Sequence, residues 1–363
     1  MKNEVISERQ AIVLIILFII GSSFLLGSGG AAKQDAWIAI IIAILWATIL
    51  LLMFSKILSL FPGKDLFDIL QILMGKFLGK IISLLMIWFA FHDGSLVLRN
   101  LSEFTRISVF DNTPVALPMI FFVILPIWCL KLGIEVFGRW SEFFIWVVII
   151  TFLTISLLAI PQMDISRLKP ILSSGIAPIL EGSFGSFSFP FGETVVFMMV
   201  FSNIAKVKNY KKTFIIGLLI GGVLIFLATL RNILLLGDKY ISRLYFPSTM
   251  AVSLIHLGNL LERLEMLVTI IFLVCSFVKV CICVFAVCNG ISKVFGLDDY
   301  KFIATPVILL MLNFSFIVYK SAMEMTFWAF NIWPYYSFPF EVIIPLIVFI
   351  LAEIKSRSLA LHK

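Results

Sequence analysis

Residues 182–193 read GSFGSFSFPFGE and interrupt an otherwise apolar segment that extends from 176 to 204. Pro190 removes a backbone hydrogen bond, and Gly192 permits dihedral angles that other residues avoid, so we expect the helix to break here. Glu193 follows directly and places a carboxylate at the break. Irregular backbone at membrane depth is costly unless it lines a cavity or is buried in protein. The stretch therefore indicates a broken membrane helix with a functional interior.

The chain around this stretch is strongly apolar. Of its 363 residues, 61% are hydrophobic and 13% are charged, and the mean hydropathy is +1.11. Soluble domains are close to half apolar and a quarter charged, so the composition excludes an ordinary soluble, disordered or coiled-coil protein. The apolar runs do not alternate as the strands of a membrane β-barrel would. We predict an all-α polytopic membrane protein in which residues 1–363 form a single transmembrane domain.

Hydropathy and length divide the chain into about ten membrane spans, because a spanning helix needs about 20 apolar residues. They form two successive halves of five, about 11–160 and about 176–352. The predicted spans are Ala11 to about Gly30, Trp37–Leu60, Phe77–Ile107, Pro114–Leu130, Trp140–Ile160, Ile176–Ile204, Phe214–Leu236, Leu264–Cys288, Phe302–Tyr319 and Phe338–Ala352.

The first span contains a second interruption, Gly21-Ser22-Ser23. Small residues also serve helix packing, which is the alternative interpretation. Paired breaks at the start of two halves, however, indicate an inverted-repeat transporter and its binding site. Free amides at a half-helix suit a carboxylate, and unwound carbonyls suit an ammonium group, so an amino acid fits chemically. The predicted ligand-binding residues at the breaks are Gly21, Ser22, Ser23, Ser188, Phe189, Pro190, Phe191, Gly192 and Glu193.

The carboxylate of Glu193 has three possible roles. It can bind the ammonium group of a ligand, accept a proton, or cap the half-helix that follows by bonding its free amides. The sequence leaves all three open.

Two further polar sites lie inside predicted spans. His92, Arg99, Glu103 and Arg106 share one face of the third span, either as the lining of a pathway or as a packed Arg99–Glu103 ion pair. Lys279 lies midway along the eighth span, where it can pair with a buried carboxylate, occupy a cation site or extend toward the membrane surface. We add His92 and Lys279 to the predicted ligand-binding residues.

The net charge is +7, and basic residues are more frequent in the loops on the side of both termini. This bias predicts cytoplasmic termini and contact with membrane lipid, with no nucleic-acid partner. The five cysteines are an odd number, and four of them lie in one apolar segment, so we expect no disulfide framework. Cys281 and Cys283 point to nearly opposite sides of a helix, so we expect no metal site between them. The sequence also contains no enzyme motif, so we expect no catalytic residues and no cofactor.

The run Phe189–Glu193, followed by an apolar half-helix, resembles the B subunit of spore germination receptors, the germination permease family. The segment Ile6–Gln10 and Gly21 also match. That family is similar to amino acid–polyamine–organocation transporters, which implies a LeuT-like five-plus-five inverted repeat with broken first and sixth helices. The resemblance further implies an inner-membrane protein of the endospore that lies beside an A subunit and a lipoprotein C subunit.

The resemblance implies a nutrient germinant, commonly an amino acid in that family, as the ligand that this subunit senses. The alternative is a proton-coupled amino acid permease, which would have the same fold and binding site. LeuT-like sodium transporters carry hydroxyl residues in the eighth span, whereas this chain has Cys275, Ser276 and Lys279 there. Coupling to sodium is therefore not expected.

Overall fold

The structure is a computed structural model that describes residues 6–108, 114, 116–173, 175–201, 209–241, 244–255 and 263–361. Helices dominate these residues, and no strand occurs among them. The prediction of an all-α protein is thus confirmed for the described part of the chain.

Eight helical segments among the described residues are long and apolar enough to cross a membrane. They are Glu8–Leu26, Gly30–Leu60, Leu66–Ser108, Ile134–Gln162, Tyr210–Leu236, Glu265–Phe295, Lys301–Val318 and Ala322–Arg357. The helix Ala116–Leu132 is apolar but shorter, and the segment 176–199 is broken in its middle. These lengths describe a polytopic membrane protein, while the count of ten spans remains a prediction.

The long helices are α1 (Glu8–Ile20), α3 (Ala36–Leu60), α4 (Leu66–Ser108), α5 (Ala116–Leu132), α6 (Ile134–Ala159), α7 (Ile176–Ser186), α8 (Tyr210–Leu236), α11 (Glu265–Phe295), α12 (Lys301–Val318) and α15 (Ile344–Leu361). The short helices are α2 (Ser23–Leu26), α9 (Asp238–Ile241), α10 (Pro247–Ser253), α13 (Ala322–Phe327) and α14 (Trp333–Phe338). Tighter or wider turns form η1 (Gly30–Asp35), η2 (Ile160–Gln162), η3 (Ile165–Leu168), η4 (Phe187–Phe191), η5 (Gly192–Met199), η7 (Trp328–Ile332) and η8 (Pro339–Ile343).

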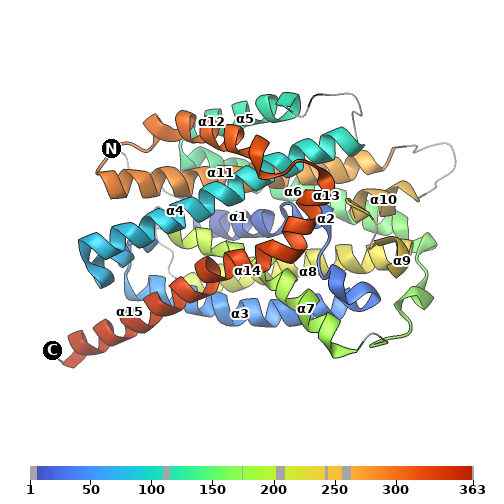
Figure 1. Ribbon diagram of the computed structural model, residues 1–363, viewed down its shortest axis with the longest axis horizontal. Coiled ribbons are helices and arrows are strands. Elements are labelled where there is room, and N and C mark those ends of the chain that lie inside the picture. Colours follow the sequence, from blue (N-terminus) through green and yellow to red (C-terminus); the bar gives the residue numbers. More distant parts are fainter. Residues whose placement is uncertain are drawn as a thin grey trace.

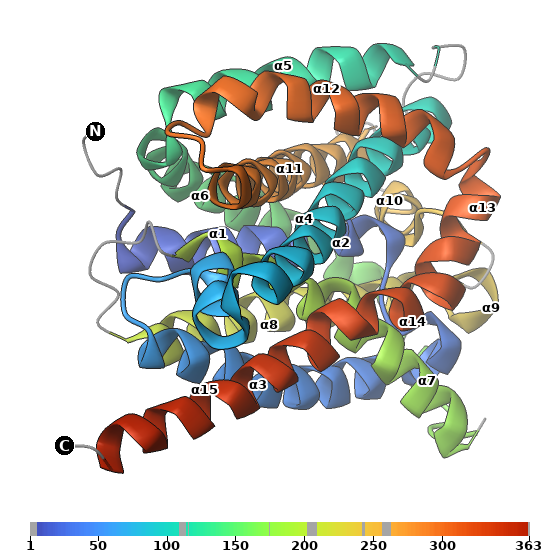
Figure 2. The ribbon, with the colours of Figure 1, turned by 60° about the vertical axis from the view of Figure 1, so that its left-hand side comes forward.

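The two ends of the helical bundle differ. Helix α1 begins and α15 ends on the same side, which we call the terminal end (Figures 1 and 2). The short helices α9, α10 and α13 lie on the opposite side, which we call the far end (Figure 1).

Helix α1 lies in the interior and packs against α8, α6 and α11. A β-carbon on Gly217 of α8 would be 2.6 Å from Ile15, and one on Gly221 would be 3.0 Å from Ile19. These glycines therefore permit the close approach of α1 and α8, as small residues do between membrane helices. The tight packing fixes the position of the first break.

A local hydrogen-bond motif determines where α1 begins. Ser7 and Gln10 form a capping box, in which the Gln10 amide donates to Ser7 Oγ at 3.2 Å and the Ser7 amide donates to Gln10 Oε1 at 2.9 Å. Such reciprocal bonds satisfy amides that the first helical turn leaves free.

One predicted boundary coincides with a break in the chain, and another is wrong. At Gly75, with φ 77° and ψ 171°, the backbone leaves the helical conformation, so α4 consists of two helices joined by a kink, and the second starts next to the predicted Phe77. The first helix turns back on the second, since a β-carbon on Gly79 would be 2.7 Å from the Gln71 Cα. The last span begins at Ala322 rather than Phe338. Its aromatic residues pack onto α4, with the ring centroids of Trp333 and Phe89 5.7 Å apart.

Candidate functional site

The first break separates α1 from α2. Gly21 has φ 22° and ψ −132°, and a β-carbon there would be 2.7 Å from the Phe18 carbonyl oxygen and 3.2 Å from Lys279 Cδ. Only glycine fits this position without strain. The Ser23 hydroxyl donates to the Ile19 carbonyl at 2.7 Å, so the end of α1 is satisfied internally. Ser22 is buried, and its hydroxyl has no partner among the described residues.

The second break lies between α7 and η5, at Phe189, whose φ of −118° and ψ of 107° leave the helical region. The Ser188 hydroxyl donates to Glu341 Oε2 at 3.0 Å and lies 2.5 Å from the Ser337 hydroxyl. A β-carbon on Gly192 would overlap the Glu341 carboxylate, so that carboxylate rests directly on the glycine. The break is therefore held from outside by the last span. Pro190 and Phe191 complete the buried turn.

Three charged side chains meet behind the breaks, and we call them the charge centre: Asp93 of α4, Glu193 of η5 and Lys279 of α11. Lys279 Nζ lies 2.5 Å from Glu193 Oε2 and 3.2 Å from Asp93 Oδ1. Each side chain is at most 3% exposed. The ammonium group also lies over the rings of Phe18 and Phe189, 5.0 Å and 5.2 Å from their centroids, where a cation is favoured.

The charge centre decides between the interpretations of Glu193 and Lys279. Lys279 pairs with buried carboxylates, as one of its predicted roles required, because a buried charge is tolerated only when it is paired. The capping role of Glu193 is wrong, since no side chain caps η5 and the carboxylate bonds Lys279 instead. Its predicted roles in proton transfer and in binding a ligand ammonium stay predictions.

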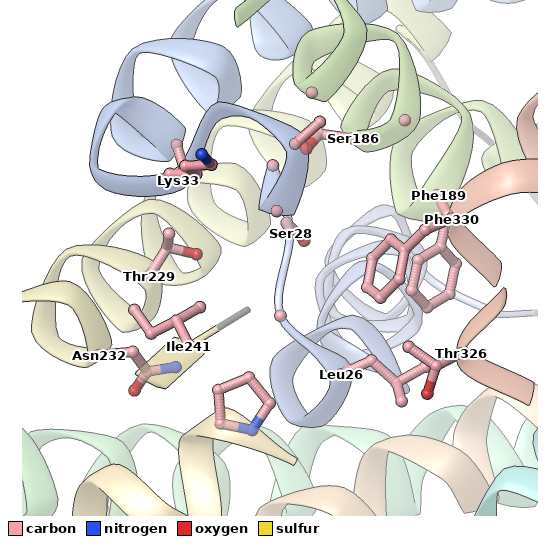
Figure 3. Close-up of a pocket in the computed structure, with 18 of the residues that line it drawn as sticks. Leu26, Ser28, Lys33, Ser186, Phe189, Thr229, Asn232, Ile241, Thr326 and Phe330 are labelled. Carbon is pink, nitrogen blue, oxygen red and sulfur yellow. The ribbon is translucent and has the colours of Figure 1, made fainter. Parts of the chain in front are cut away.

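A cavity of about 340 Å³ lies on the far-end side of the breaks (Figure 3). It is enclosed by the segment after the first break and the segment before the second, together with α8 and the α13–η7 segment. Its exposed rim carries Lys33 and Glu181, so it reaches the surface. Lining side chains with polar groups are Ser28, Ser186, Thr229, Asn232, Thr326 and Asn331.

A second pocket, of about 20 Å³, adjoins the charge centre. It has the volume of about one water molecule. Phe189 and Leu26 line both spaces and therefore form the wall between them. Of the predicted ligand-binding residues, all of which the structure describes, Phe189 alone lines the large cavity, and Glu193 and Lys279 line the small pocket.

The structure places His92 apart from the breaks, in a cluster of aromatic rings. Its Nδ1 lies 2.9 Å from the Tyr336 hydroxyl, which also accepts from Trp88 Nε1 at 2.8 Å. The Trp88 ring stacks on the imidazole with centroids 5.6 Å apart. His92 lines neither pocket.

The remaining polar residues of the predicted α4 stripe form an ion-paired group. Glu103 is fully buried and accepts from Arg99 Nη2 and Arg106 Nη2, both at 2.7 Å. The packed-pair interpretation thus describes them, although the pair lies within one helix and does not join two.

A third group of charges lies near the terminal end, where α3 connects to α4. Lys293 Nζ of α11 lies 2.6 Å from Asp65 Oδ2 and 2.5 Å from Asp68 Oδ2. Asn289 donates to Asp65 Oδ2 and to the Met199 carbonyl, both at 2.8 Å. The α3–α4 connection is thereby joined to α11 and to the end of η5.

Sequence reasoning missed several of these residues. Asp93 is not among the predicted site residues, because its partner Lys279 is distant in sequence. Glu341 was overlooked, although it follows Phe338-Pro339-Phe340, a short echo of Phe189-Pro190-Phe191 before Glu193. This repeated Phe-Pro-Phe pattern, followed by a carboxylate inside an apolar span, is the sequence signal that identifies Glu341 as a candidate.

Comparison with known sequences reveals relatives along nearly the whole chain. A family model described as spore germination protein matches residues 5–324. Spore germination protein KB of Bacillus subtilis (strain 168) is 28% identical over 361 residues, which cover 98% of this chain and 97% of the relative. Spore germination protein A2 of the same organism is 24% identical, and the match covers 90% of this chain and 88% of the relative.

Among solved structures, the chain is similar to Mhp1, a nucleobase-cation-symport-1 family transporter in a closed conformation with bromovinylhydantoin bound. The TM-score is 0.63 at 12% sequence identity, and the match covers 93% of this chain and 79% of Mhp1. At this identity the likeness concerns the fold alone, which is that of a transporter.

Proposed function

We propose that this chain, which belongs to the spore germination protein family, is the subunit of a germination receptor that senses a nutrient germinant. Family membership and the transporter fold make it a permease-like, multi-pass membrane protein rather than an enzyme. The germinant is a small molecule, in our proposal an amino acid, and it binds in the cavity at the far end.

The observation that carries this proposal is the position of the cavity. It lies between the segment that follows the first break and the segment that precedes the second, where transporters of this architecture bind solutes. Its volume of about 340 Å³ falls within the range of small-molecule sites. The lining combines apolar walls with a few amide and hydroxyl groups, which suits a small zwitterion better than a lipid chain.

The predicted site residues take different places in this proposal. Phe189 contacts the germinant, whereas Gly21–Ser23 and Ser188–Glu193 shape the broken backbone behind it. Lys279 holds the two breaks through the charge centre, so a ligand that moves Phe189 also disturbs the ion pairs. His92 supports the last span against α4.

The finer architecture belongs to the same proposal. Ten spans form a LeuT-like five-plus-five inverted repeat, with halves at about 11–160 and about 176–352. Both termini are cytoplasmic in the inner membrane of the endospore, so the cavity faces outward, from where a germinant arrives. An A subunit and a lipoprotein C subunit complete the receptor and carry the signal onward.

A substitution at Gly185 tests the location of the germinant. Gly185 lines the cavity, and a β-carbon there would contact nothing within 4 Å. Gly185→Leu fills the space without a clash, and leucine is a better helix former than glycine by roughly 0.5–1 kcal/mol. We expect normal accumulation in the membrane and loss of germination in response to amino acids.

Gly185→Ala is the matched control, because it adds a single methyl group and leaves most of the cavity free. Its response should stay near that of the wild type. A normal dose–response for Gly185→Leu at equal protein levels would contradict binding in this cavity.

A proton-coupled amino acid permease is the second candidate, and a specific observation favours it. Glu341 is fully buried, and its Oε1 has no partner among the described residues. Carboxylates inside membrane proteins often belong to proton relays. Purified protein in liposomes distinguishes the candidates: uptake of labelled amino acid driven by a pH gradient and abolished by Glu341→Gln supports the permease, and binding without uptake supports the sensor.

A further inference from the structure

Arg231 is a buried cation that the charge centre does not use. It lies on α8, is 2% exposed, and has its guanidinium 5.6 Å from the centroid of the Phe24 ring. Its Nε and Nη2 donate to Asn232 Oδ1 at 3.3 Å and 3.0 Å, while Nη1 has no partner among the described residues. No described carboxylate pairs with it. A buried guanidinium without a counter-charge is costly, so its retention calls for an explanation.

The guanidinium fixes the orientation of the neighbouring amide. Arginine has only hydrogen-bond donors, so the oxygen of Asn232 must face Arg231 and its nitrogen must face away. That nitrogen donates to Ser248 Oγ at 2.9 Å, and Ser248 in turn donates to the Phe24 carbonyl. The amide therefore cannot rotate without losing bonds on both sides.

Asn232 also lines the cavity, on the wall that faces Phe189 and Phe330 (Figure 3). An amide nitrogen carries two hydrogens, and Ser248 accepts one of them. The second hydrogen is a donor held in place at the cavity wall. The positive charge of Arg231 behind it strengthens its attraction for an anion.

We propose that Asn232, oriented by Arg231, is the subsite that binds the carboxylate of the germinant. This inference rests on the proposed function and adds the chemical class of the ligand: a small molecule with a free carboxylate. Asn232 contacts the carboxylate directly, whereas Arg231 acts through Asn232 as a positioning residue and supplies the compensating charge. A neutral analogue that lacks the negative charge binds more weakly.

The substitution Asn232→Asp separates stability from recognition. It gives Arg231 a carboxylate partner, so the unfolding temperature should be equal to or higher than that of the wild type. It also replaces the donor with a negatively charged acceptor, so carboxylates should be repelled. We expect thermal-shift titrations of the purified protein with each of the twenty amino acids to show affinity at least about tenfold lower than wild type.

Asn331→Asp is the matched control, because it makes the same change at another position of the cavity lining. Its effect should be clearly smaller than that of Asn232→Asp. An equal loss would mean that any added negative charge repels the ligand, and it would overturn the assignment of Asn232.

Arg231→Gln tests the positioning role with Asn232 intact. The readout is the ratio of affinities for the best amino acid and for its carboxamide, which keeps the carbonyl but lacks the charge. The wild type should prefer the acid at least about tenfold, and the variant should lose most of that preference. A purely structural role of Arg231 would weaken acid and amide alike and leave the ratio unchanged.

The outcomes distinguish this inference from the proposed function. In one outcome, the wild type and Asn232→Asp bind amino acids equally well, while Gly185→Leu does not bind them. That result would support binding in the cavity and would show that the carboxylate subsite at Asn232 is wrong. Equal affinity of the wild type for acid and amide also overturns the subsite. If none of the twenty amino acids stabilises the wild type, the amino acid class fails, and the subsite fails with it.

Discussion

The charge centre and the cavity lie on two sides of Phe189 and use polar groups in opposite ways. In the charge centre, Lys279 is bonded to both Glu193 and Asp93, and the adjoining space is about 20 Å³. In the cavity, the space is about 340 Å³, and the buried hydroxyl of Ser186 has no partner among the described residues. Polar groups that satisfy one another hold the breaks, whereas polar groups left open beside a space are those available to a ligand.

The largest effect expected from this comparison is at Lys279. The substitution Lys279→Met leaves Glu193 and Asp93 buried without a counter-charge, and breaking a buried ion pair in this way typically costs about 3–5 kcal/mol. We expect the protein to unfold at a much lower temperature and to accumulate poorly. Thermal unfolding of the purified protein measures the loss.

Removing the orphaned charges provides the control for Lys279→Met. The triple variant that also carries Glu193→Gln and Asp93→Asn should regain most of the stability, because no buried charge remains unpaired. A triple variant no more stable than Lys279→Met would show that the lysine stem, rather than its charge, holds the breaks.

A smaller effect is expected at Ser188, which is fully buried and donates to Glu341. Ser188→Ala removes that bond from a buried carboxylate, which should cost about 1–3 kcal/mol. The same unfolding measurement applies. Ser337 also forms a side-chain hydrogen bond with Glu341. Unchanged stability would indicate that this second bond alone satisfies the carboxylate.

The smallest stability effect is expected two residues earlier, at Ser186. Its hydroxyl bonds no described residue and lines the cavity, so Ser186→Ala should change stability by no more than about 0.5 kcal/mol. If the cavity binds the proposed germinant, sensitivity to it should fall nevertheless, in a dose–response at matched protein levels. Equal destabilisation by Ser186→Ala and Ser188→Ala would contradict the distinction between hydroxyl groups that hold the breaks and hydroxyl groups that are free to bind a ligand.

The fold class followed from composition, and both breaks followed from residue types. Pro190, Gly192 and Gly21 have backbone requirements that depend on no distant residue, so sequence alone could locate them. The start of the last span could not be predicted in this way, because the aromatic residues around Trp333 are as compatible with an interface as with a buried helix face.

The position of the cavity could not be inferred in the same way. Sequence gives the depth of a residue in the membrane but not its lateral neighbours, so it could indicate that Lys279 needs a carboxylate without identifying Asp93 and Glu193 together. It also placed the ligand at the breaks, where Phe189 closes off the space. Asn232 carries no sequence signal, because its role depends on the side chain next to it and on Ser248.

At the terminal end, the side chain of Asn289 links η5 to the α3–α4 connection. One amide group donates to the Met199 carbonyl, which ends η5, and to the carboxylate of Asp65, the last residue of the α3–α4 connection before α4. A shift of η5 along its axis therefore cannot leave that connection undisturbed. In our proposal, a germinant that displaces Phe189 and shifts η5 would therefore act on the α3–α4 connection at the terminal end of the bundle, without any solute passing through.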